Sequence, residues 1–432
     1  MGARWKLGRQ FGWLWAAYAV SAFGTWLAFD AFPMIAIMVL HAGAAQVSLL
    51  AAAGLAVGAA VAVPLGPWME FRRKRPVMIT MDVVRFAALM TVPVLFLLGR
   101  LTFVQLVVVS VVVSAADIAF TAASGAYLKA LVPREDLLVA NARFESTSWT
   151  ATMLGPQIGG AAIGLFGPVM AVAANAVSFL LSAAGIRAIG GTEPRPERAG
   201  PPPRLRAGGL LEGWRCILTH PALRPLFFNQ VLVGGLIMAT APLLAVLMLG
   251  SLGFAPWQYA MAFTLPCAGG LIGSRLAPRL AARFGRHRVM LISGALRACW
   301  LPGLAFVRPG TAGLVLVMAV ELGLICCMGV FTPLYATYRL DRTPADRVAR
   351  TLSAWSVSSK ATIAILTALW GLLAAVTGPR IAIATAGVLS LATPLLLPRH
   401  EHDAPRPAPP RAGIGGEPHL MRSLHDPSER TS

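Results

Sequence analysis

Long runs of apolar residues, separated by short polar or charged segments, make up most of this chain. Asp, Glu, Lys and Arg are absent from residues 31–69, 146–186 and 225–274. Each of these blocks has room for two helices of about 20 residues, the length that crosses about 30 Å of hydrocarbon, with a short turn between them. The pattern therefore predicts an all-α, polytopic membrane protein.

The same pattern predicts the number and position of the membrane-spanning helices. Dividing the apolar runs into stretches of about 20 residues gives about twelve spans. They lie near residues 12–39, 46–69, 77–99, 102–126, 142–166, 168–188, 226–249, 257–279, 289–307, 312–335, 354–376 and 379–397.

Composition agrees with a membrane protein. Of the 432 residues, 13% are charged and 56% are hydrophobic, whereas about a quarter of the residues in a soluble domain are charged. The net charge of +19 would suggest a nucleic-acid partner in a soluble chain. Here, however, the basic residues lie between alternate apolar spans, so we expect a lipid bilayer and no nucleic acid. The five cysteines have neither a disulfide nor a zinc pattern, and we expect no metal and no cofactor.

The distribution of Lys and Arg predicts the orientation of the chain. Connections on one side carry the segment 187–224 and Arg72, Arg73, Lys74, Arg75, Lys129, Arg134, Arg283, Arg286, Arg288, Arg339, Arg342, Arg347 and Arg350. Connections on the other side carry only Arg100, Arg308 and Arg380. Because cytoplasmic loops are enriched in Lys and Arg, we expect a multi-pass protein of the cell membrane with both termini in the cytoplasm.

Proline and glycine divide the chain into two halves. Residues 190–209 read GGTEPRPERAGPPPRLRAGG, which is incompatible with a regular element. A short helix is expected directly afterwards, at 210–218. The predicted organisation is a cytoplasmic tail (1–11), a six-helix bundle (12–188), a linker (189–225), a second six-helix bundle (226–397) and a disordered cytoplasmic tail (398–432).

The two halves are related by a repeat of about 212 residues. Motifs correspond at offsets of 209 to 212 in several places: Val77-Met78 with Val289-Met290, Arg85 with Arg297, Val-Pro-Arg-Glu135 with Thr-Pro-Ala-Asp346, and Pro33 with Pro242. Parallel six-helix repeats related by an axis along the membrane normal are typical of secondary transporters, whose substrate site lies near the midplane between the repeats.

Four motifs resemble the major facilitator superfamily, and within it the enterobactin-exporter-like branch of drug:proton antiporters. Gly66-Pro-Trp-Met-Glu-Phe-Arg-Arg-Lys-Arg75 is similar to the family loop G-x-x-x-D-R-x-G-R-R, and Arg283-Phe-Gly-Arg-His-Arg288 is similar to its second copy. Leu-Val-Pro-Arg-Glu-Asp-Leu-Leu-Val-Ala-Asn-Ala-Arg143 follows the fourth span, and Gly155-Pro-Gln-Ile-Gly-Gly160 resembles the exporters' G-P-x-x-G-G. The resemblance covers residues 10–397 and implies two pseudo-twofold-related six-helix bundles.

The loops and the glycine motif supply candidate gating residues. The short loop Glu70–Arg75 carries a carboxylate and several cations, and Asp82 and Arg85 lie one turn apart on the helix that follows it. We therefore expect a charge network that locks the cytoplasmic side. Proline bends a helix and glycine allows close helix packing, which predicts a hinge or, alternatively, simple packing in the fifth span. The candidates are Gly66, Glu70, Arg73, Lys74, Arg75, Asp82, Arg85, Gly155, Pro156, Gly159, Gly160, Arg283, Gly285 and Arg286.

Ionisable residues within the apolar spans are the sharpest functional signal, because a charge at mid-bilayer is costly without a partner or water. Asp30, Asp117, Glu321 and Arg297 lie inside predicted spans. By resemblance, the first, fourth, seventh and tenth spans line a central cavity, which Asp30, Asp117 and Glu321 could reach. We expect Asp30 or Asp117 to carry a coupling proton and to attract a cationic substrate. The alternative is a buried ion pair, for instance between Glu321 and Arg297.

Uncharged residues complete the candidate cavity: Trp26, Gln157, Asn175, Asn229 and Gln230. The chain has no nucleotide-binding G-x-x-x-x-G-K-[ST] and no H-E-x-x-H motif, so we do not expect an enzyme. The prediction is a monomeric transporter that exports a small amphipathic drug, antibiotic or siderophore. It works by alternating access, with proton-coupled antiport. Such efflux would confer multidrug resistance. Alternatives are an uptake permease, a lipid flippase or a non-transporting membrane receptor.

Overall fold

Helices account for all regular structure in the part of the chain that the structure describes. The computed structural model describes residues 7–29, 31–41, 46, 50, 53–54, 57, 60, 72–190 and 211–398. Most of the predicted span 46–69 lies outside these residues, as do Asp30, Gly66, Glu70, most of the linker and the C-terminal tail. Nine helices of the described part are long and apolar enough to cross a membrane, which confirms the all-α polytopic class.

The helices of the first half follow the predicted spans closely. They are α1 (Gly8–Leu27), α2 (Ala31–Met38), α5 (Lys74–Leu97), α6 (Phe103–Leu131), α7 (Leu137–Phe166) and α8 (Pro168–Arg187). The first predicted span corresponds to α1 and α2 together. The predicted spans 102–126 and 142–166 were too short, because α6 and α7 each continue about a turn beyond the apolar run toward the charged connection between them.

The second half begins with the short helix expected after the linker, α10 (Glu212–Thr219). Its longer helices are α11 (Leu223–Ala245), α12 (Pro256–Thr264), α13 (Cys267–Phe284), α14 (Arg286–Trp300), α15 (Thr311–Arg342), α16 (Val348–Thr377) and α17 (Pro379–Ala392). The predicted span 257–279 is divided between α12 and α13. A π-helical turn, Val246–Ser251, extends α11, and 3₁₀ turns extend α14 and α17.

Glycines with positive φ mark the same turns in both halves. Gly167 (φ 82°) and Gly378 (φ 89°) each end one helix, and the following Pro168 and Pro379 each begin the next. This order suits both residues, because glycine tolerates positive φ and proline is preorganised for the first helical position. The two turns stand one repeat apart in the sequence, so the local geometry supports the duplication.

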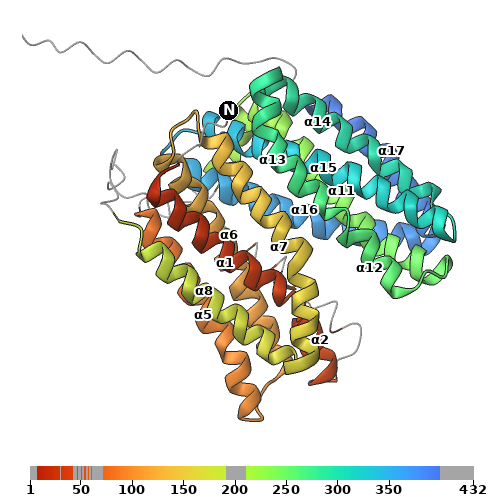
Figure 1. Ribbon diagram of the computed structural model, residues 1–432, viewed down its shortest axis with the longest axis horizontal. Helices are drawn as coiled ribbons and strands as arrows, with labels where there is room; N and C mark the ends of the chain where they lie inside the picture. The colour runs from red at the N-terminus through yellow and green to blue at the C-terminus, as the bar shows by residue number, and fades with distance from the viewer. Residues whose placement is uncertain are drawn as a thin grey trace, which may run out of the picture. The chain divides into compact units, whose positions relative to one another are not determined.

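Each half packs mainly within itself, and a few helix pairs join the halves. In the first half α5 packs against α6 and α8, and α1 against α7 and α8, while in the second α15 packs against α13 and α14, and α11 against α16. Across the halves, α7 contacts α13 and α15, and α6 contacts α16. Figure 1 shows α7 alongside α1. These cross-half pairs enclose the candidate site.

One end of the molecule is called the basic end below. It carries Arg134 in the connection α6–α7, Arg286 at the start of α14 and Arg347 in the connection α15–α16. Contacts between the halves close this end. The ammonium of Lys129 on α6 donates to the carbonyls of Leu340 and Thr343, at the C-terminal end of α15. A cation is favourable there because helix carbonyls and the helix dipole both present negative charge.

Candidate functional site

A cavity of about 370 Å³ lies between the two halves. Helices α1, α6 and α7 of the first half and α15 and α16 of the second supply most of its wall. Its lining combines hydroxyl, aromatic and charged side chains, including Tyr18, Trp26, Arg85, Asp117, Phe120 and Arg339. A concave site with a few convergent polar groups is the usual form of a small-molecule site.

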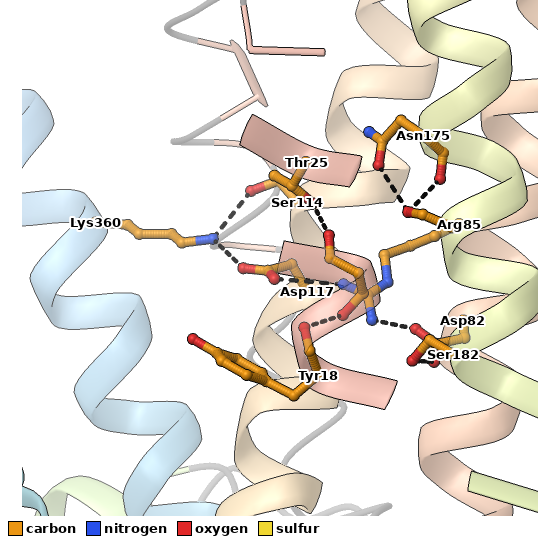
Figure 2. Close-up of polar contacts among 11 residues, drawn as sticks. Tyr18, Thr25, Asp82, Arg85, Ser114, Asp117, Asn175, Ser182 and Lys360 are labelled. Carbon is orange, nitrogen blue, oxygen red and sulfur yellow. Dashed lines mark hydrogen bonds and ion pairs between the residues drawn. The ribbon is translucent and has the colours of Figure 1, made fainter. Parts of the chain in front are cut away.

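Asp117 is the acidic group of this cavity. It lies near the middle of α6, and 47% of its side chain is exposed. One carboxylate oxygen lies 3.5 Å from Nη1 of Arg85, and the other lies 3.2 Å from Nζ of Lys360 on α16. Figure 2 shows the carboxylate between these two cations. Asp117 therefore joins a cation of its own half to a cation of the opposite half.

Arg85 is held in place independently of Asp117. Its guanidinium forms an ion pair with Asp82, which is fully buried, and Asp82 also accepts a hydrogen bond of 2.7 Å from Ser182 on α8. The guanidinium lies over the rings of Phe120 and Phe179, at 4.4 and 4.2 Å from their centroids. Removing either partner of this buried ion pair would be costly, because the other would be left as an uncompensated charge.

Arg297 occupies the corresponding position of the second half but has different partners. Its Nη1 donates to Gln230 at 2.8 Å, its Nη2 donates to Asn229, and its guanidinium lies 3.7 Å from the centroid of the Phe331 ring. Asn229 is itself fixed by donating to the carbonyl of Thr393 at 2.7 Å. The structure therefore gives Arg297 two amide partners in place of the Glu321 that was considered as an ion-pair partner.

The remaining predicted cavity residues lie in several places. Trp26 lines the cavity, whereas Asn229 and Gln230 are not among its lining residues. Gln157 bridges the halves by donating to Thr264 at 2.9 Å. Asn175 is buried and contacts Ser178 on its own helix. Glu321 is buried on α15, away from the cavity lining.

Two of the predicted gating groups make contacts that the sequence did not specify. Arg75 donates to the carbonyl of Ile189 within the first half. Arg286 donates to the carbonyl of Glu135 at 2.9 Å, and thereby joins the second half to the first at the basic end.

The other loop candidates lie around the turns at this end. Arg73 directly precedes α5 and Lys74 begins it. Gly285 makes the turn between α13 and α14 with φ 87°, and the guanidinium of Arg283 lies 5.2 Å from the ring centroid of Phe284.

The glycine motif of α7 is a contact surface for α1. A Cβ at Gly155 would meet Trp26, and a Cβ at Gly159 would meet the backbone of Leu27, while a Cβ at Gly160 would meet open space. Gly155 and Gly159 therefore allow α7 to approach α1 closely, one turn apart, next to Pro156. This contact lies directly beside the cavity, because Trp26 belongs to both.

Two cations of the site were missed in the sequence. Lys360 lies in the middle of α16 and completes the Asp117 network, and its place inside an apolar run was the signal that should have identified it. Arg339 lies in the long basic extension of α15 and was assigned to a loop. It lines the cavity, donates to the hydroxyl of Tyr335 at 2.8 Å and lies over the rings of Tyr335 and Trp355.

The duplicated helical bundle and the ionisable cavity between its halves define a membrane transporter of the secondary type. The chain belongs to the Major Facilitator Superfamily, whose sequence profile matches residues 14–326 and 226–427. Members of this family are transporters and not enzymes. No curated protein matches the chain significantly.

Solved structures of transporters share the fold at low sequence identity. A bacterial homologue of the iron transporter ferroportin, in an outward-facing state, has a TM-score of 0.74 and 17% identity, over 90% of this chain and 98% of the other. The human organic anion transporter MFSD10 (TETRAN) has a TM-score of 0.71 and 14% identity, over 90% and 99%. The E. coli fucose:proton symporter FucP gives 0.63 and 13%, over 89% and 97%.

Proposed function

We propose that this transporter exports a small amphipathic compound in exchange for protons, with Asp117 as the proton-carrying group. The observation that carries the proposal is the position of Asp117, half exposed in the cavity and in contact with Arg85 of one half and Lys360 of the other. A carboxylate in this position can reach water through the cavity and also influences how the halves are held together.

Protonation of Asp117 would weaken one of the contacts between the halves. A neutral carboxylic acid no longer attracts the ammonium of Lys360, whereas Arg85 keeps its second carboxylate, Asp82. The first half therefore stays internally compensated while its electrostatic attachment to α16 is lost. Proton binding thus favours a different arrangement of the halves, which is the requirement for coupling a proton to alternating access.

The lining of the cavity supports an amphipathic substrate. Its volume of about 370 Å³ lies at the lower end of the range of small-molecule sites, about 300–1,000 Å³. Trp26 and Phe120 provide aromatic surfaces, and hydroxyl groups of Tyr18, Ser21 and Thr25 lie on the α1 side, as Figure 2 shows for Tyr18 and Thr25. Charged groups and aromatic faces are thus available to the same molecule.

The contacts at the basic end support the alternating-access part of the proposal. Besides Lys129, the ion pair between Arg134 and Asp341, at 3.0 Å, closes this end across the halves. Residues 358–377 form the part of α16 that is farther from the basic end, and none of them is buried. With the basic end in the cytoplasm, this arrangement corresponds to a transporter that is closed to the cytoplasm. Export is favoured by the resemblance of the α7 glycine motif to that of exporters.

Two assays test the proposal with variants of the full chain. An efflux-deficient host that expresses the wild type is expected to accumulate less of a transported dye or antibiotic than the host alone, and Asp117→Asn is expected to lose this effect. In proteoliposomes, an imposed pH gradient should drive substrate movement by the wild type and not by Asp117→Asn. Glu321→Gln, which removes a carboxylate outside the cavity lining, is the matched control.

The outcomes of these assays separate the alternatives. Full pH-driven transport by Asp117→Asn would show that another group carries the proton. Uptake that increases with expression of the wild type would identify a permease, and transport without any response to the pH gradient would contradict proton coupling.

A further inference from the structure

A second concave surface, separate from the central cavity, lies between α1 and α7 of the first half and α13 of the second. This groove has a volume of about 750 Å³. It is called the α7–α13 groove below. Helix α7 contacts both α1 and α13. Its walls include the apolar side chains of Trp15 and Phe23 on α1, and its basic groups are Arg143 on α7 and Arg275 and Arg279 on α13.

The charge of this groove is of one sign. Three arginines line it, and no aspartate or glutamate is among its described lining residues. Arg275 and Arg279 are exposed, lie one turn apart on the same face of α13, and form no ion pair among the described residues. Arg275 and Arg279 therefore present positive charge that an anion from outside the chain would compensate.

Both arginines lie within α13 and not in the connection that follows it. They stand nine and five residues before Phe284, where α13 ends at the basic end. With a rise of about 1.5 Å per residue, their Cα atoms lie about 14 and 8 Å from that end of the helix. In a bilayer whose headgroup layer lies at the basic end, arginine at this distance from the helix end would extend its guanidinium toward the lipid phosphates.

Hydroxyl groups also line the groove. The Oγ atoms of Ser146 on α7 and Ser274 on α13 are 2.7 Å apart, so the floor of the groove is a contact between the two halves. Thr147 accepts a hydrogen bond of 2.8 Å from the indole of Trp15. A headgroup in this position would meet cations and hydroxyls, while its acyl chains would continue along Trp15 and Phe23.

We propose that the α7–α13 groove binds an anionic phospholipid from the leaflet at the basic end, with Arg275 and Arg279 on its phosphate. Basic pockets between transmembrane helices bind such headgroups by charge complementarity. A lipid is the occupant that the groove fits, because cationic groups and an apolar wall lie side by side between helices of a membrane protein.

The position of the groove gives this lipid a regulatory role. Helices α1 and α7 belong to one half and α13 to the other, and the three walls lie together in this arrangement, in which the basic end is closed. A ligand that binds one arrangement better than another stabilises it. The lipid therefore favours the closed basic end and increases the resistance of the protein to unfolding.

Lipid binding to the purified full chain tests the proposal. The probes are phosphatidylglycerol, phosphatidylcholine with the same acyl chains, and inorganic phosphate, added to the protein in detergent. Native mass spectrometry counts bound lipid, and the midpoint of thermal unfolding reports stabilisation. We expect phosphatidylglycerol to bind and to raise the midpoint, and the other two probes to have little effect. Each lost arginine should weaken binding about fivefold, so Arg275→Gln/Arg279→Gln should weaken it about 30-fold.

Two further variants make the result specific. Arg215→Gln removes an exposed arginine of α10 at the same end, outside the groove lining, and should bind phosphatidylglycerol as the wild type does. Arg275→Lys/Arg279→Lys keeps both charges and should retain most of the binding. If the double Gln variant fails to fold, the single variants Arg275→Gln and Arg279→Gln replace it, and each should weaken binding about fivefold. Equal stabilisation by both lipids, stabilisation by inorganic phosphate alone, or unchanged binding by the double Gln variant would overturn the proposal.

Discussion

Arg85 and Arg297 are equivalent positions of a duplicated fold that have acquired different surroundings. Each is buried and belongs to the corresponding helix of its half, and each lies over a phenylalanine, Phe120 or Phe331, of the next long helix. Arg85 has carboxylate partners in Asp82 and Asp117, whereas the amides of Asn229 and Gln230 hold Arg297. The duplication thus preserved the cation and changed the groups that compensate it.

This difference separates a titratable site from a structural one. The partners of Arg297 are amides, which neither bind nor release protons in the physiological range. Asp117, by contrast, is a carboxylic acid, and it contacts both Arg85 and Lys360 of the opposite half. The proposed proton coupling therefore belongs to the first half, whereas the hydrogen bonds of Arg297 link α14 to α11.

The largest effect is expected for Arg85→Met. The variant leaves Asp82 as an uncompensated charge in a fully buried position, and such a loss costs about 3–5 kcal/mol of the free energy of unfolding. Chemical unfolding of the purified protein in detergent measures this change. Asp117 also loses a partner, so pH-driven transport should fall to the background level.

The double variant Asp82→Leu/Arg85→Met is the control for this prediction. Replacing both members of a buried ion pair by apolar residues is often neutral, so the double variant should recover most of the stability without recovering transport. A double variant that is as unstable as Arg85→Met would show that the cost arises from packing and not from the unpaired carboxylate.

A smaller loss is expected for Arg297→Met. No charge is left unpaired; only the amide oxygens of Asn229 and Gln230 lose their donor, at about 1–3 kcal/mol for a buried acceptor without a partner. The same unfolding measurement applies, and pH-driven transport should persist at a reduced rate. If Arg297→Met proved more destabilising than Arg85→Met, the two sites would not differ in the way described.

The smallest effect is expected for Arg134→Gln at the basic end. Its ion pair with Asp341 is partly exposed, with 49% of the arginine side chain accessible, and exposed pairs contribute about 0–1 kcal/mol. The stability should therefore hardly change. Opening of the basic end should become more frequent, and the modification rate of a single cysteine introduced at Ser356 in the cavity wall measures it; an unchanged rate would argue against a gating role.

The architecture could be predicted from the sequence because membrane spans depend on the length of apolar runs. The positions of ten predicted spans, α7 among them, agree with helices of the structure to within a few residues at most ends, and the repeat that relates Arg85 to Arg297 was visible in the sequence. Helix ends at the charged connections were the main error. Apolar residues stop where the bilayer stops, but backbone hydrogen bonding continues into polar sequence, as it does to Leu131 in α6.

The site was less predictable because apolar spans do not show which side faces the cavity. In α6 the apolar residues surround the helix almost evenly, so the orientation of Asp117 follows only from packing. Asn229 and Gln230 were expected at the cavity, but they face Arg297 on the neighbouring α14. Lys360 was overlooked, although a lysine inside an apolar run needs an acidic partner, and Asp117 was already a candidate.

Proton flux that accompanies substrate movement tests the central claim most directly. Proteoliposomes loaded with a pH-sensitive dye and given an outwardly or inwardly directed substrate gradient, without an imposed pH gradient, report protons carried in exchange. The wild type and Glu321→Gln should move protons opposite to the substrate, and Asp117→Asn should move substrate down its gradient with no proton signal. A proton signal of wild-type size from Asp117→Asn would contradict the account.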